Sequence, residues 1–519
     1  MATSDDQNIQ ALFQKGFDFH RQGKFAEAER FYRETLRLAP KHFDALHLLG
    51  LLALQSGKAQ EGVTLIEQAI ASNPNVAAAY NNLGNGLKTL GHCDAALEKF
   101  DKAIELEPKM AEAHDNRGNT LSDLKRYDEA QESYTHAINL KPDFAEALFH
   151  RGNAFRCLGR FEEALADYGR VVGLRPDFAG AFCNRGNALK ELNRYKEALE
   201  SFKAATQLRP NYAEALFNLG MCELQLGEFE KGWEHYEWRK KSTVPAAARR
   251  YVQPAWKGEN LAQKTLFVYS EQGFGDTIQF CRYVQRAEKL NASVIVAAPK
   301  PLHRLLSPLH VIDEDKTPPH FDYHCAMLSL PMVFKTTLDT IPAEIPYLSA
   351  DKKEVDFFRT KLLRAKKTRI GFVWAGTPRN ERDCWRSLKF EQALPLFENS
   401  AVEWISLQHF VPESDVSALA KSGIINWGKD FADFAAAAAA IMALDLVISV
   451  DTAVAHLAGA LGKPVWILLP FSSDWRWLTE RDDTPWYPTA RLFRQSKRGE
   501  WENVIKEVAT EVGRLSQKE

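Results

Sequence analysis

The sequence predicts an α-solenoid of short helical repeats, followed by an α/β region with two lobes built on parallel sheets. A proline recurs every 34 positions in the first half of the 519-residue chain, at Pro40, Pro74, Pro108, Pro142, Pro176 and Pro210. A glycine series keeps the same step, at Gly16, Gly50, Gly84, Gly118, Gly152, Gly186 and Gly220. Near residue 240 this period ends, and short β-branched and aromatic runs begin to alternate with helical stretches. Such alternation is typical of parallel sheets covered by helices.

Each 34-residue unit has the pattern helix, tight turn, helix, loop. Twelve positions after each glycine of the series stands a small residue, and four positions further stands a large apolar one. The small residue lets two helices approach closely, and the large one fills the groove between them. The proline follows the second helix, where no further amide donor is required. The pattern resembles the tetratricopeptide repeat over residues 9–240, with six full units and a seventh that lacks its closing proline. Such repeats stack into a superhelical solenoid with a concave groove.

Asparagine recurs on the inner helix of these repeats. It stands two positions before or one position after the series glycine, so both sets share one helix face. The residues are Asn82, Asn85, Asn116, Asn119, Asn153, Asn184, Asn187 and Asn218. Because asparagine is an indifferent helix former and its amide both donates and accepts hydrogen bonds, we expect a ladder that binds the backbone of an extended acceptor polypeptide. The ladder resembles that of eukaryotic O-GlcNAc transferase. The alternative is inherited repeat consensus, with amides that face only water.

The composition limits the partners and the compartment. The net charge is −2 and basic residues are scattered, so neither nucleic acid nor an anionic membrane is an expected partner. No run approaches the roughly 18 apolar residues of a membrane-spanning helix, and the polar first ten residues argue against a signal peptide. The seven cysteines, an odd number without a CxxC pair, indicate thiols in a reducing compartment. We expect a cytoplasmic protein.

The second half of the chain contains six runs that predict strands. Most are apolar on both faces, as in the central strands of parallel sheets. They lie at 265–269, 293–297, 369–374, 402–407, 446–450 and 465–469. We expect a linker at 241–261 and two Rossmann-like lobes, at 262–350 and 366–519. Ligands of such sheets bind beyond the carboxyl ends of the strands.

The first candidate site residues lie in the turn after the strand predicted at 265–269. Gly273, Gly275 and Asp276 stand there, and a helix is predicted at 277–290. Glycines allow a ligand to approach the backbone closely, and Asp276 projects from the first helical turn. A carboxylate at this position is also a good helix cap, so a purely structural role is the alternative.

The second candidate turn follows the strand predicted at 446–450. It contains Asp451 and Thr452 and leads into a short helix predicted at 453–461. The free amides at the start of a helix carry roughly half a positive charge and bind anions. His456 lies four residues along the same helix face, although a lone helical histidine is more often structural.

These turns together resemble the bacterial ADP-heptose transferase family over about residues 262–519. The matching residues are Gly275, Asp276, the segment 371–376, Arg386, Ser387, Asp451, Thr452, His456, Leu457, Ala458 and Pro464. The resemblance implies a GT-B fold of two facing Rossmann-like lobes, with the acceptor on the first lobe and the nucleotide sugar on the second. It also implies inverting, metal-independent glycosyl transfer. Ala453 departs from the family pattern, which often has glycine after the Asp-Thr pair.

The resemblance further implies roles for individual residues. Asp276 matches the family's general base, which takes the proton of the acceptor hydroxyl as that oxygen attacks the anomeric carbon. Arg386 is expected to neutralise the leaving phosphate, with a surface arginine as the alternative. The expected donor-binding residues are Gly273, Gly275, Trp374, Gly376, Arg386, Ser387, Asp451, Thr452 and His456. We expect no metal, and no cofactor besides the nucleotide-sugar co-substrate.

Two other features have a structural interpretation. One acidic triplet imitates the DxD metal motif of other glycosyltransferases, but it lies among turn residues and we interpret it as a solvated turn: Asp313, Glu314 and Asp315. A tryptophan group either stacks on a nucleobase or forms a core cluster, and the sequence leaves both open: Trp475, Trp477 and Trp486.

The combination of repeats and lobes predicts sugar transfer onto protein. We expect a glycosyltransferase that moves a sugar from a nucleotide-sugar donor to Ser or Thr hydroxyls of an acceptor protein held in the repeat groove. The layout is similar to that of O-GlcNAc transferase and of flagellin glycosyltransferases, so a flagellin-like protein is one expected acceptor. Two alternatives remain: a transferase for lipid-linked or lipopolysaccharide sugars that uses the repeats for recruitment, and a non-catalytic repeat scaffold. The sugar, the nucleotide base and the oligomeric state stay open.

Overall fold

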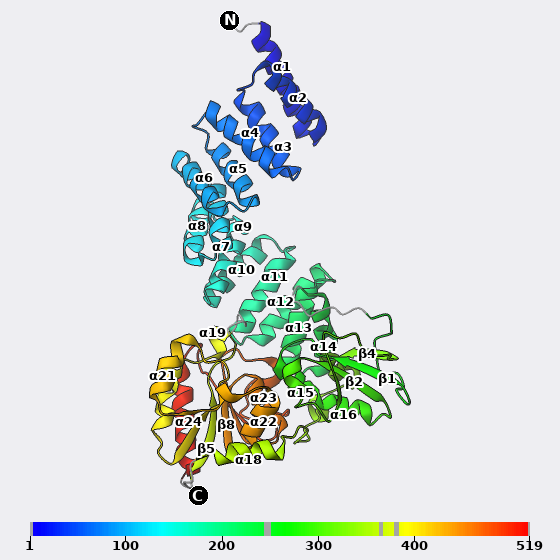
Figure 1. The fold of residues 1–519 in the computed structure, drawn as a ribbon. Coiled ribbons are helices and arrows are strands. Elements are labelled where there is room, and N and C mark those ends of the chain that lie inside the picture. Colours follow the sequence, from blue (N-terminus) through cyan, green and yellow to red (C-terminus); the bar gives the residue numbers. More distant parts are fainter. Residues whose placement is uncertain (1–3, 243–250, 363–366, 378–382, 517–519) are drawn as a thin grey trace. The chain divides into compact units, whose positions relative to one another are not determined.

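The computed structural model describes residues 4–242, 251–362, 367–377 and 383–516 (Figure 1). The chain forms two compact units, Met1–Leu189 and Lys190–Glu519. The first unit is helical, and the second combines the last helices of the repeat array with two parallel sheets.

Helices of the repeat array fill the described chain from its start to residue 236, coloured blue to green in Figure 1. They come in consecutive pairs, which confirms the predicted tetratricopeptide-type array. Their bounds are α1 (Ser4–Arg21), α2 (Phe25–Leu38), α3 (Phe43–Gln55), α4 (Ala59–Ser72), α5 (Ala77–Thr89), α6 (Cys93–Leu106), α7 (Ala111–Asp123), α8 (Tyr127–Leu140), α9 (Ala145–Cys157), α10 (Phe161–Leu174), α11 (Ala179–Glu191), α12 (Tyr195–Leu208), α13 (Ala213–Gln225) and α14 (Phe229–Tyr236).

The 34-residue glycine series is explained by contact between the two helices of each repeat. A Cβ atom at Gly118 of α7 would lie 2.6 Å from the ring of Tyr134 on α8. A Cβ atom at Gly84 would likewise lie 2.6 Å from the ring of Phe100. Both aromatic side chains are fully buried or nearly so. The step is therefore a packing requirement, because any side chain at the glycine position overlaps the ring that fills the groove.

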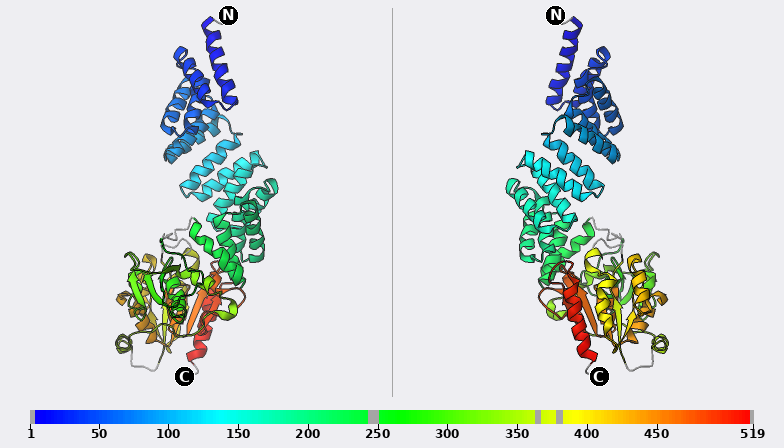
Figure 2. Two further views of the ribbon diagram at one scale, coloured as in Figure 1. Left: turned by 90° about the vertical axis from the view of Figure 1, so that its right-hand side faces the viewer. Right: turned by 90° about the vertical axis from the view of Figure 1, so that its left-hand side faces the viewer.

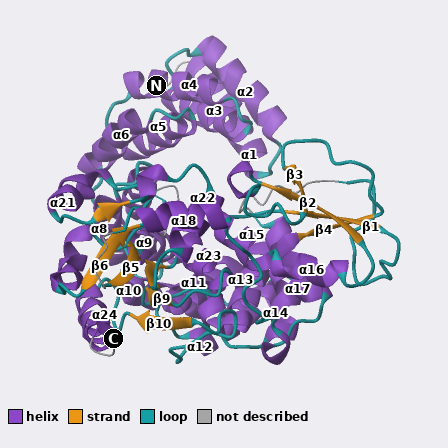
Figure 3. Cartoon of the chain, turned by 60° about the horizontal axis from the view of Figure 1, so that its bottom comes forward, coloured by secondary structure: helices purple, strands orange, loops and turns teal. Residues whose placement is uncertain are grey.

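The second unit contains two sheets whose strands all pair in parallel (Figure 3). The first sheet has the order β3-β2-β1-β4, with β1 (Thr265–Tyr269), β2 (Ser293–Ala298), β3 (His310–Asp313) and β4 (Tyr323–Ala326). The second has the order β10-β9-β8-β5-β6-β7, with β5 (Thr368–Val373), β6 (Val402–Ser406), β7 (Ile425–Asn426), β8 (Leu446–Val450), β9 (Val465–Leu469) and β10 (Ala490–Arg494). We call these sheets, with their helices, the first and second lobes. Two lobes with parallel sheets confirm the predicted fold class.

Helices cover both sheets and carry the strand connections. Their bounds are α15 (Phe274–Phe280), α16 (Arg282–Glu288), α17 (Leu330–Val333), α18 (Lys352–Thr360), α19 (Asp383–Arg386), α20 (Phe390–Ala393), α21 (Val416–Lys421), α22 (Phe434–Met442), α23 (Ala453–Ala460) and α24 (Trp501–Ser516). The single helix predicted at 277–290 is wrong: α15 begins earlier, capped at Gly273, and Cys281 separates it from α16. The C-terminal α24, red in Figure 2, packs against β10 and α20.

The last repeat helices belong to the same compact unit as the two lobes. The indole N–H of Trp233 on α14 donates to the carbonyl of Thr336 at 2.8 Å, and its ring lies 5.3 Å from that of Trp475. The Gln225 amide at the end of α13 donates to the carbonyl of Leu478 at 2.6 Å. These contacts are buried, so the helices α13 and α14 are a structural part of the α/β region.

A matched pair of glycine substitutions tests the packing of the repeats. Gly118→Ala is expected to lower the free energy of unfolding by about 1–3 kcal/mol, because the new methyl group overlaps Tyr134. Gly169→Ala is the control: it lies in α10 with open space around it, and replacing a helical glycine by alanine stabilises by roughly 0.5–1 kcal/mol. Urea unfolding of the two variants checks this; equal effects would contradict the packing explanation.

Candidate functional site

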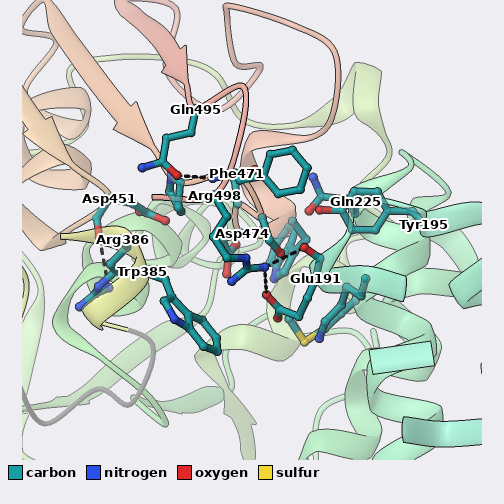
Figure 4. Close-up of a pocket in the computed structure, with 16 residues that line it drawn as sticks. Glu191, Tyr195, Gln225, Trp385, Arg386, Asp451, Phe471, Asp474, Gln495 and Arg498 are labelled. Carbon is teal, nitrogen blue, oxygen red and sulfur yellow. Dashed lines mark hydrogen bonds and ion pairs between the residues drawn. The ribbon is translucent and has the colours of Figure 1, made fainter. Parts of the chain in front are cut away.

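A pocket lies beyond the carboxyl ends of β8, β9 and β10, in the place expected for ligands of parallel sheets. Asp451 follows β8 directly and lines the pocket with Arg386 and Asp474 (Figure 4). Tyr195 and Gln225, from the repeat helices α12 and α13, line the same pocket. All its lining residues belong to the unit Lys190–Glu519. Residues of the second lobe and residues of the last repeats therefore face one space.

Asp276 lies in the first turn of α15, where the first lobe meets the second. Its Oδ2 accepts from the backbone N–H of Gly273 at 2.9 Å, so this one carboxylate oxygen caps the helix. A Cβ atom at Gly275 would lie 2.9 Å from the ring of His456, so α15 packs closely on α23 of the second lobe. The Asp276 side chain keeps 21% of its surface exposed. The structure thus brings the two predicted turns together; part of the Asp276 side chain stays exposed, although Asp276 is not among the residues that line the pocket.

Arg476 joins Asp276 to the second lobe, and sequence analysis missed it. Its Nη2 pairs with Asp276, its Nη1 donates to Asp474 at 2.8 Å, and its Nε donates to Gln279 at 2.6 Å. Only 7% of the Arg476 side chain is exposed. Burial raises the pKa of Asp276 above its usual value, Arg476 opposes this rise, and the neighbouring Asp474 adds to it. No local sequence motif predicts the contact between Arg476 and Asp276, because the two residues lie 200 positions apart in the chain.

Asp451 and His456 form a second pair at the pocket. Burial raises the pKa of Asp451 to about 6, and the nearby Asp474 carboxylate adds to the rise. Burial lowers the pKa of His456 to about 3, with the Arg476 charge acting in the same direction, so this imidazole is neutral. His456 Nε2 lies 3.9 Å from Asp451 Oδ1, and Nδ1 shares a 2.9 Å hydrogen bond with the Tyr487 hydroxyl. His456 is buried, is held by the Tyr487 hydrogen bond and stacks on Trp477, as a structural histidine would be.

The loops after β5 and β8 are tied together by Arg386. Its Nη1 donates to the carbonyl of Asp451 at 3.2 Å, and its Nε pairs with Asp383 at 3.0 Å. A Cβ atom at Gly376 would lie 2.2 Å from Asp383 Oδ1 and 2.3 Å from the Arg386 guanidinium, so a side chain there would displace the ends of these two side chains. The backbone N–H of Gly376 in turn donates to Ser387 Oγ at 2.9 Å. Arg386 is thus held at the pocket wall by these contacts, with 23% of its side chain exposed.

Thr452 begins α23, but its hydroxyl does not cap the helix. Its Oγ1 lies 3.0 Å from Ser449 Oγ, and no side-chain cap bond forms at this helix start. The Thr452 carbonyl accepts from the backbone N–H groups of Ala455 at 3.1 Å and His456 at 3.4 Å, whereas its hydroxyl caps no N–H group of the first turn.

Trp374 does not join the other predicted donor residues. Its side chain is fully buried in the second lobe, and its indole N–H donates to Asp415 at 2.8 Å. A ligand has no surface of this side chain to contact, which corrects the prediction from the segment 371–376. The other tryptophan group is also part of the core, since Trp475, Trp477 and Trp486 are at most 2% exposed. Trp475 still contributes to the pocket lining, together with Trp385, which the sequence analysis did not single out.

The acidic triplet lies away from the pocket. Asp313 ends β3 and pairs with Lys300 at 3.3 Å. Within the described ranges, no group of three or more His, Cys, Asp or Glu side chains is arranged to hold a metal ion. The same ranges contain no helix with the length and apolarity that crossing a bilayer requires.

The asparagines of the repeats link one repeat to the next. Three side chains at the position two residues before the series glycine each bond a residue 35 positions earlier: Asn82 with His47, Asn116 with Asn81, and His150 with Asp115. Asn184 donates to Asn153, whose Oδ1 also accepts from the Tyr168 hydroxyl. Asn119 donates to Asp115 and accepts from the Tyr134 hydroxyl. The predicted ladder is thus partly occupied by bonds within the protein, which neither interpretation of the sequence included.

Three predicted ladder residues fall outside this chain of bonds. Asn218, in the second unit, donates to the Glu214 carbonyl and accepts from Lys190. Asn187 has a buried Oδ1 without a hydrogen-bond partner in the described part of the chain. Asn85 is half-buried on α5.

The raised pKa of Asp451 predicts a change in the pH dependence of stability. The folded chain holds the Asp451 proton to about pH 6, whereas an unfolded chain releases it near about pH 4. The contribution of Asp451 to the free energy of unfolding is therefore largest below about pH 4 and falls as the pH rises to about 6. Asp451→Asn removes this fall, so the variant should gain stability relative to wild type between about pH 4.5 and about pH 7 in urea unfolding. If the difference in the free energy of unfolding between the two proteins does not change with pH, this prediction is wrong.

Comparison with known protein families separates the chain into two kinds of segment. Residues 432–496 match the model of glycosyltransferase family 9 (heptosyltransferase), a segment that includes β8, α23, β9 and β10. Tetratricopeptide repeat models match residues 19–84 and 81–130, and then 118–156, 152–193 and 186–227.

Individual relatives share part of this layout. The chain is 26% identical over 311 residues to Protein FlbA of Caulobacter vibrioides, which covers 54% of this chain and 52% of that protein. The chain therefore matches about half the length of this curated relative. Among solved structures, it is similar to YrrB, a TPR protein with an unusual peptide-binding site (27% identity, TM-score 0.31, 34% of this chain and 91% of that one). It is also similar to PilF of Pseudomonas aeruginosa (18% identity, TM-score 0.38), over 41% of this chain and 97% of that one. The chain carries tetratricopeptide repeats in its N-terminal region and a glycosyltransferase family 9 domain at its C-terminus.

Proposed function

We propose that this chain is a glycosyltransferase that moves a sugar from a nucleotide-sugar donor to Ser or Thr hydroxyls of an acceptor protein. The donor lies on the second lobe, and the acceptor hydroxyl reaches the Asp276 side of the cleft. The proposal keeps the predicted division into repeats (9–240), linker (241–261), acceptor-side lobe (262–350) and donor-side lobe (366–519). Flagellin-like proteins are one class of acceptor, and the cytoplasm is the proposed compartment.

One observation supports the proposal more than any other: repeat helices and donor-side residues line a single pocket. Arg386 and Asp451 come from the second lobe, whereas Tyr195 and Gln225 come from helices of the repeat array. Figure 4 shows the two groups facing each other, with Glu191 at the end of α11 bonded to Arg498 after β10. A polypeptide that leaves the last repeats along this wall passes the donor side of the pocket.

The proposed chemistry is a direct displacement with inversion. The acceptor oxygen attacks the anomeric carbon while Asp276 takes its proton, and the bond from that carbon to the diphosphate oxygen breaks. The nucleoside diphosphate leaves with the bonding electrons, so its charge requires stabilisation as it forms. The backbone N–H groups of Ala453 and Val454, at the start of α23, and the Arg386 guanidinium are the proposed donors. Asp451 and Thr452 are proposed to hold the donor, and His456 to position Asp451 as a neutral neighbour. Gly273, Gly275, Gly376 and Ser387 shape the backbone around these groups.

A screen of nucleotide sugars tests the proposed function directly. We expect one nucleotide sugar from a panel with different bases to raise the melting temperature of the full chain and to be hydrolysed slowly without acceptor. Asp276→Asn is expected to lower this hydrolysis by about 10²–10⁴-fold, the usual contribution of a positioned base, while the thermal shift by the same nucleotide sugar persists. Full activity of the variant would remove Asp276 from the role. If no nucleotide sugar binds, the scaffold alternative is favoured.

The repeat asparagines are proposed to bind the acceptor with the amide groups that the internal network leaves available. Asn116 and Asn184 each donate to a neighbouring repeat through Nδ2, and an amide also has an acceptor oxygen. These oxygens are suited to accept from backbone N–H groups of an extended polypeptide, whatever its side chains. The proposed ladder remains the whole set: Asn82, Asn85, Asn116, Asn119, Asn153, Asn184, Asn187 and Asn218.

Removing two ladder amides tests acceptor binding. Asn116→Ala combined with Asn184→Ala is expected to raise the Michaelis constant for a protein acceptor by roughly tenfold or more, since each lost hydrogen bond contributes about 0.5–1.5 kcal/mol. Hydrolysis of the nucleotide sugar should not change. The control is Asn139→Ala, which removes an exposed amide from the outer helix α8. An unchanged acceptor constant in the double variant would count against the ladder.

A further inference from the structure

A buried guanidinium, that of Arg476, links the two lobes beside the pocket. Arg476 lies in the loop after β9 of the second lobe, and it contacts Asp276 and Gln279 on α15 of the first. Its remaining N–H groups face Asp474, which accepts both from the side chain at 2.8 Å and from the Arg476 backbone at 3.1 Å. All three nitrogens of the guanidinium therefore have partners; two of these are carboxylates, and one of them, Asp474, lines the pocket.

We propose that Arg476 is a positioning residue for glycosyl transfer: it fixes the Asp276 carboxylate at the lobe junction in the orientation and ionised form that proton removal requires. This inference rests on the proposed function, in which Asp276 acts as base. It assigns Arg476 no contact with the nucleotide sugar, because its nitrogens are already occupied and its side chain is 7% exposed.

The geometry requires arginine in particular. One planar guanidinium reaches the Asp276 and Gln279 side chains of one lobe and Asp474 of the other at the same time. A lysine ammonium carries its charge on one nitrogen, so it cannot donate to all three of these acceptors in the planar arrangement that they require. The guanidinium is also fixed by packing, since it lies 4.6 Å from the Trp475 ring and 5.4 Å from the Phe280 ring.

The charges around Asp276 show what the arginine does there. The facing groups are Arg476 and Asp474 from the loop after β9, His456 from α23, and Tyr236 from α14. His456 is neutral, and the Tyr236 hydroxyl keeps its proton because burial raises its pKa to about 12. Arg476 is thus the one cation among the groups that face Asp276 in the described residues. Without it, burial and the Asp474 charge both favour the protonated acid, which accepts no proton from the acceptor.

The pH dependence of hydrolysis tests this role. The probe is the nucleotide sugar that the panel identifies, with release of nucleoside diphosphate by the full chain measured between about pH 5 and about pH 9. Arg476→Met should lower the rate near neutral pH by about tenfold or more, move the acid limb upward by about one unit or more, and recover activity at higher pH. Arg476→Lys should give a smaller shift. Asp474→Asn should move the acid limb in the opposite direction.

A matched control separates this effect from the general loss of a paired arginine. Arg491 lies on the edge strand β10, and its guanidinium pairs with Glu511 of α24. Arg491→Met should leave the acid limb in place. An acid limb that Arg476→Met does not move would overturn the proposal. So would a loss of the thermal shift by ADP, GDP, UDP and CDP with an unmoved acid limb, because Arg476 would then be a ligand of the diphosphate.

A second measurement requires no turnover and keeps the proposal separate from the proposed function. Arg476→Met leaves Asp276 buried without its cation, and the double variant with Asp276→Asn removes that unpaired charge. At neutral pH the double variant should therefore unfold at a higher urea concentration than Arg476→Met alone. If wild type hydrolyses no nucleotide sugar, the proposed function fails while this comparison still tests the pairing. If the double variant unfolds at the same urea concentration as Arg476→Met or at a lower one, the proposed pairing of Arg476 with Asp276 is overturned.

Discussion

The candidate site depends on the packing of one side chain, Trp475. Its ring lies 5.3 Å from Trp233 and 5.8 Å from Tyr236, both on the last repeat helix, and 6.4 Å from Phe280 at the end of α15. Since Asp474 and Arg476 flank Trp475 in the sequence, this packing determines where their charged groups lie. A second buried link acts on the same region, because Arg239 pairs with Glu271 at 2.7 Å just before the Gly273 turn. The repeat array therefore helps to build the cleft as well as extending from it.

The sequence was sufficient for the architecture because regular patterns determine it. The 34-residue step locates the helix pairs, and six apolar runs locate β1, β2, β5, β6, β8 and β9 to within a residue at each end. The four strands that were not predicted, β3, β4, β7 and β10, are short or lie toward the sheet edges. Edge strands are less uniformly apolar, as the exposed or half-buried residues of β3 illustrate, so they lack the signal that identifies a central strand.

The site was only partly predictable, because its charges meet through tertiary contacts. Local turn patterns selected Asp276 and Asp451, and the family resemblance selected Arg386. In the structure Asp451 and Arg386 line one pocket, and Asp276 is linked to its wall through Arg476. The turn patterns could not reveal Asp474 and Arg476, whose place is set by packing of Trp475 against a helix from another part of the chain. Trp374 shows the opposite error: it stands in a matching segment, but its side chain points into the core. The asparagines show a third limit, since the residue type suggested binding while the bonds between repeats depend on superhelical geometry.

The boundary between the two compact units has an evolutionary consequence. It falls at residues 189 and 190, inside the repeat array and not at its end. Duplication or deletion of whole 34-residue modules upstream of that point leaves the aromatic and ionic supports of the cleft untouched. The last repeats have no such freedom, because their buried contacts with both lobes tie their sequence to the chemistry. Selection can therefore lengthen, shorten or diversify the upstream array while the part of the chain that contains the two lobes stays constant.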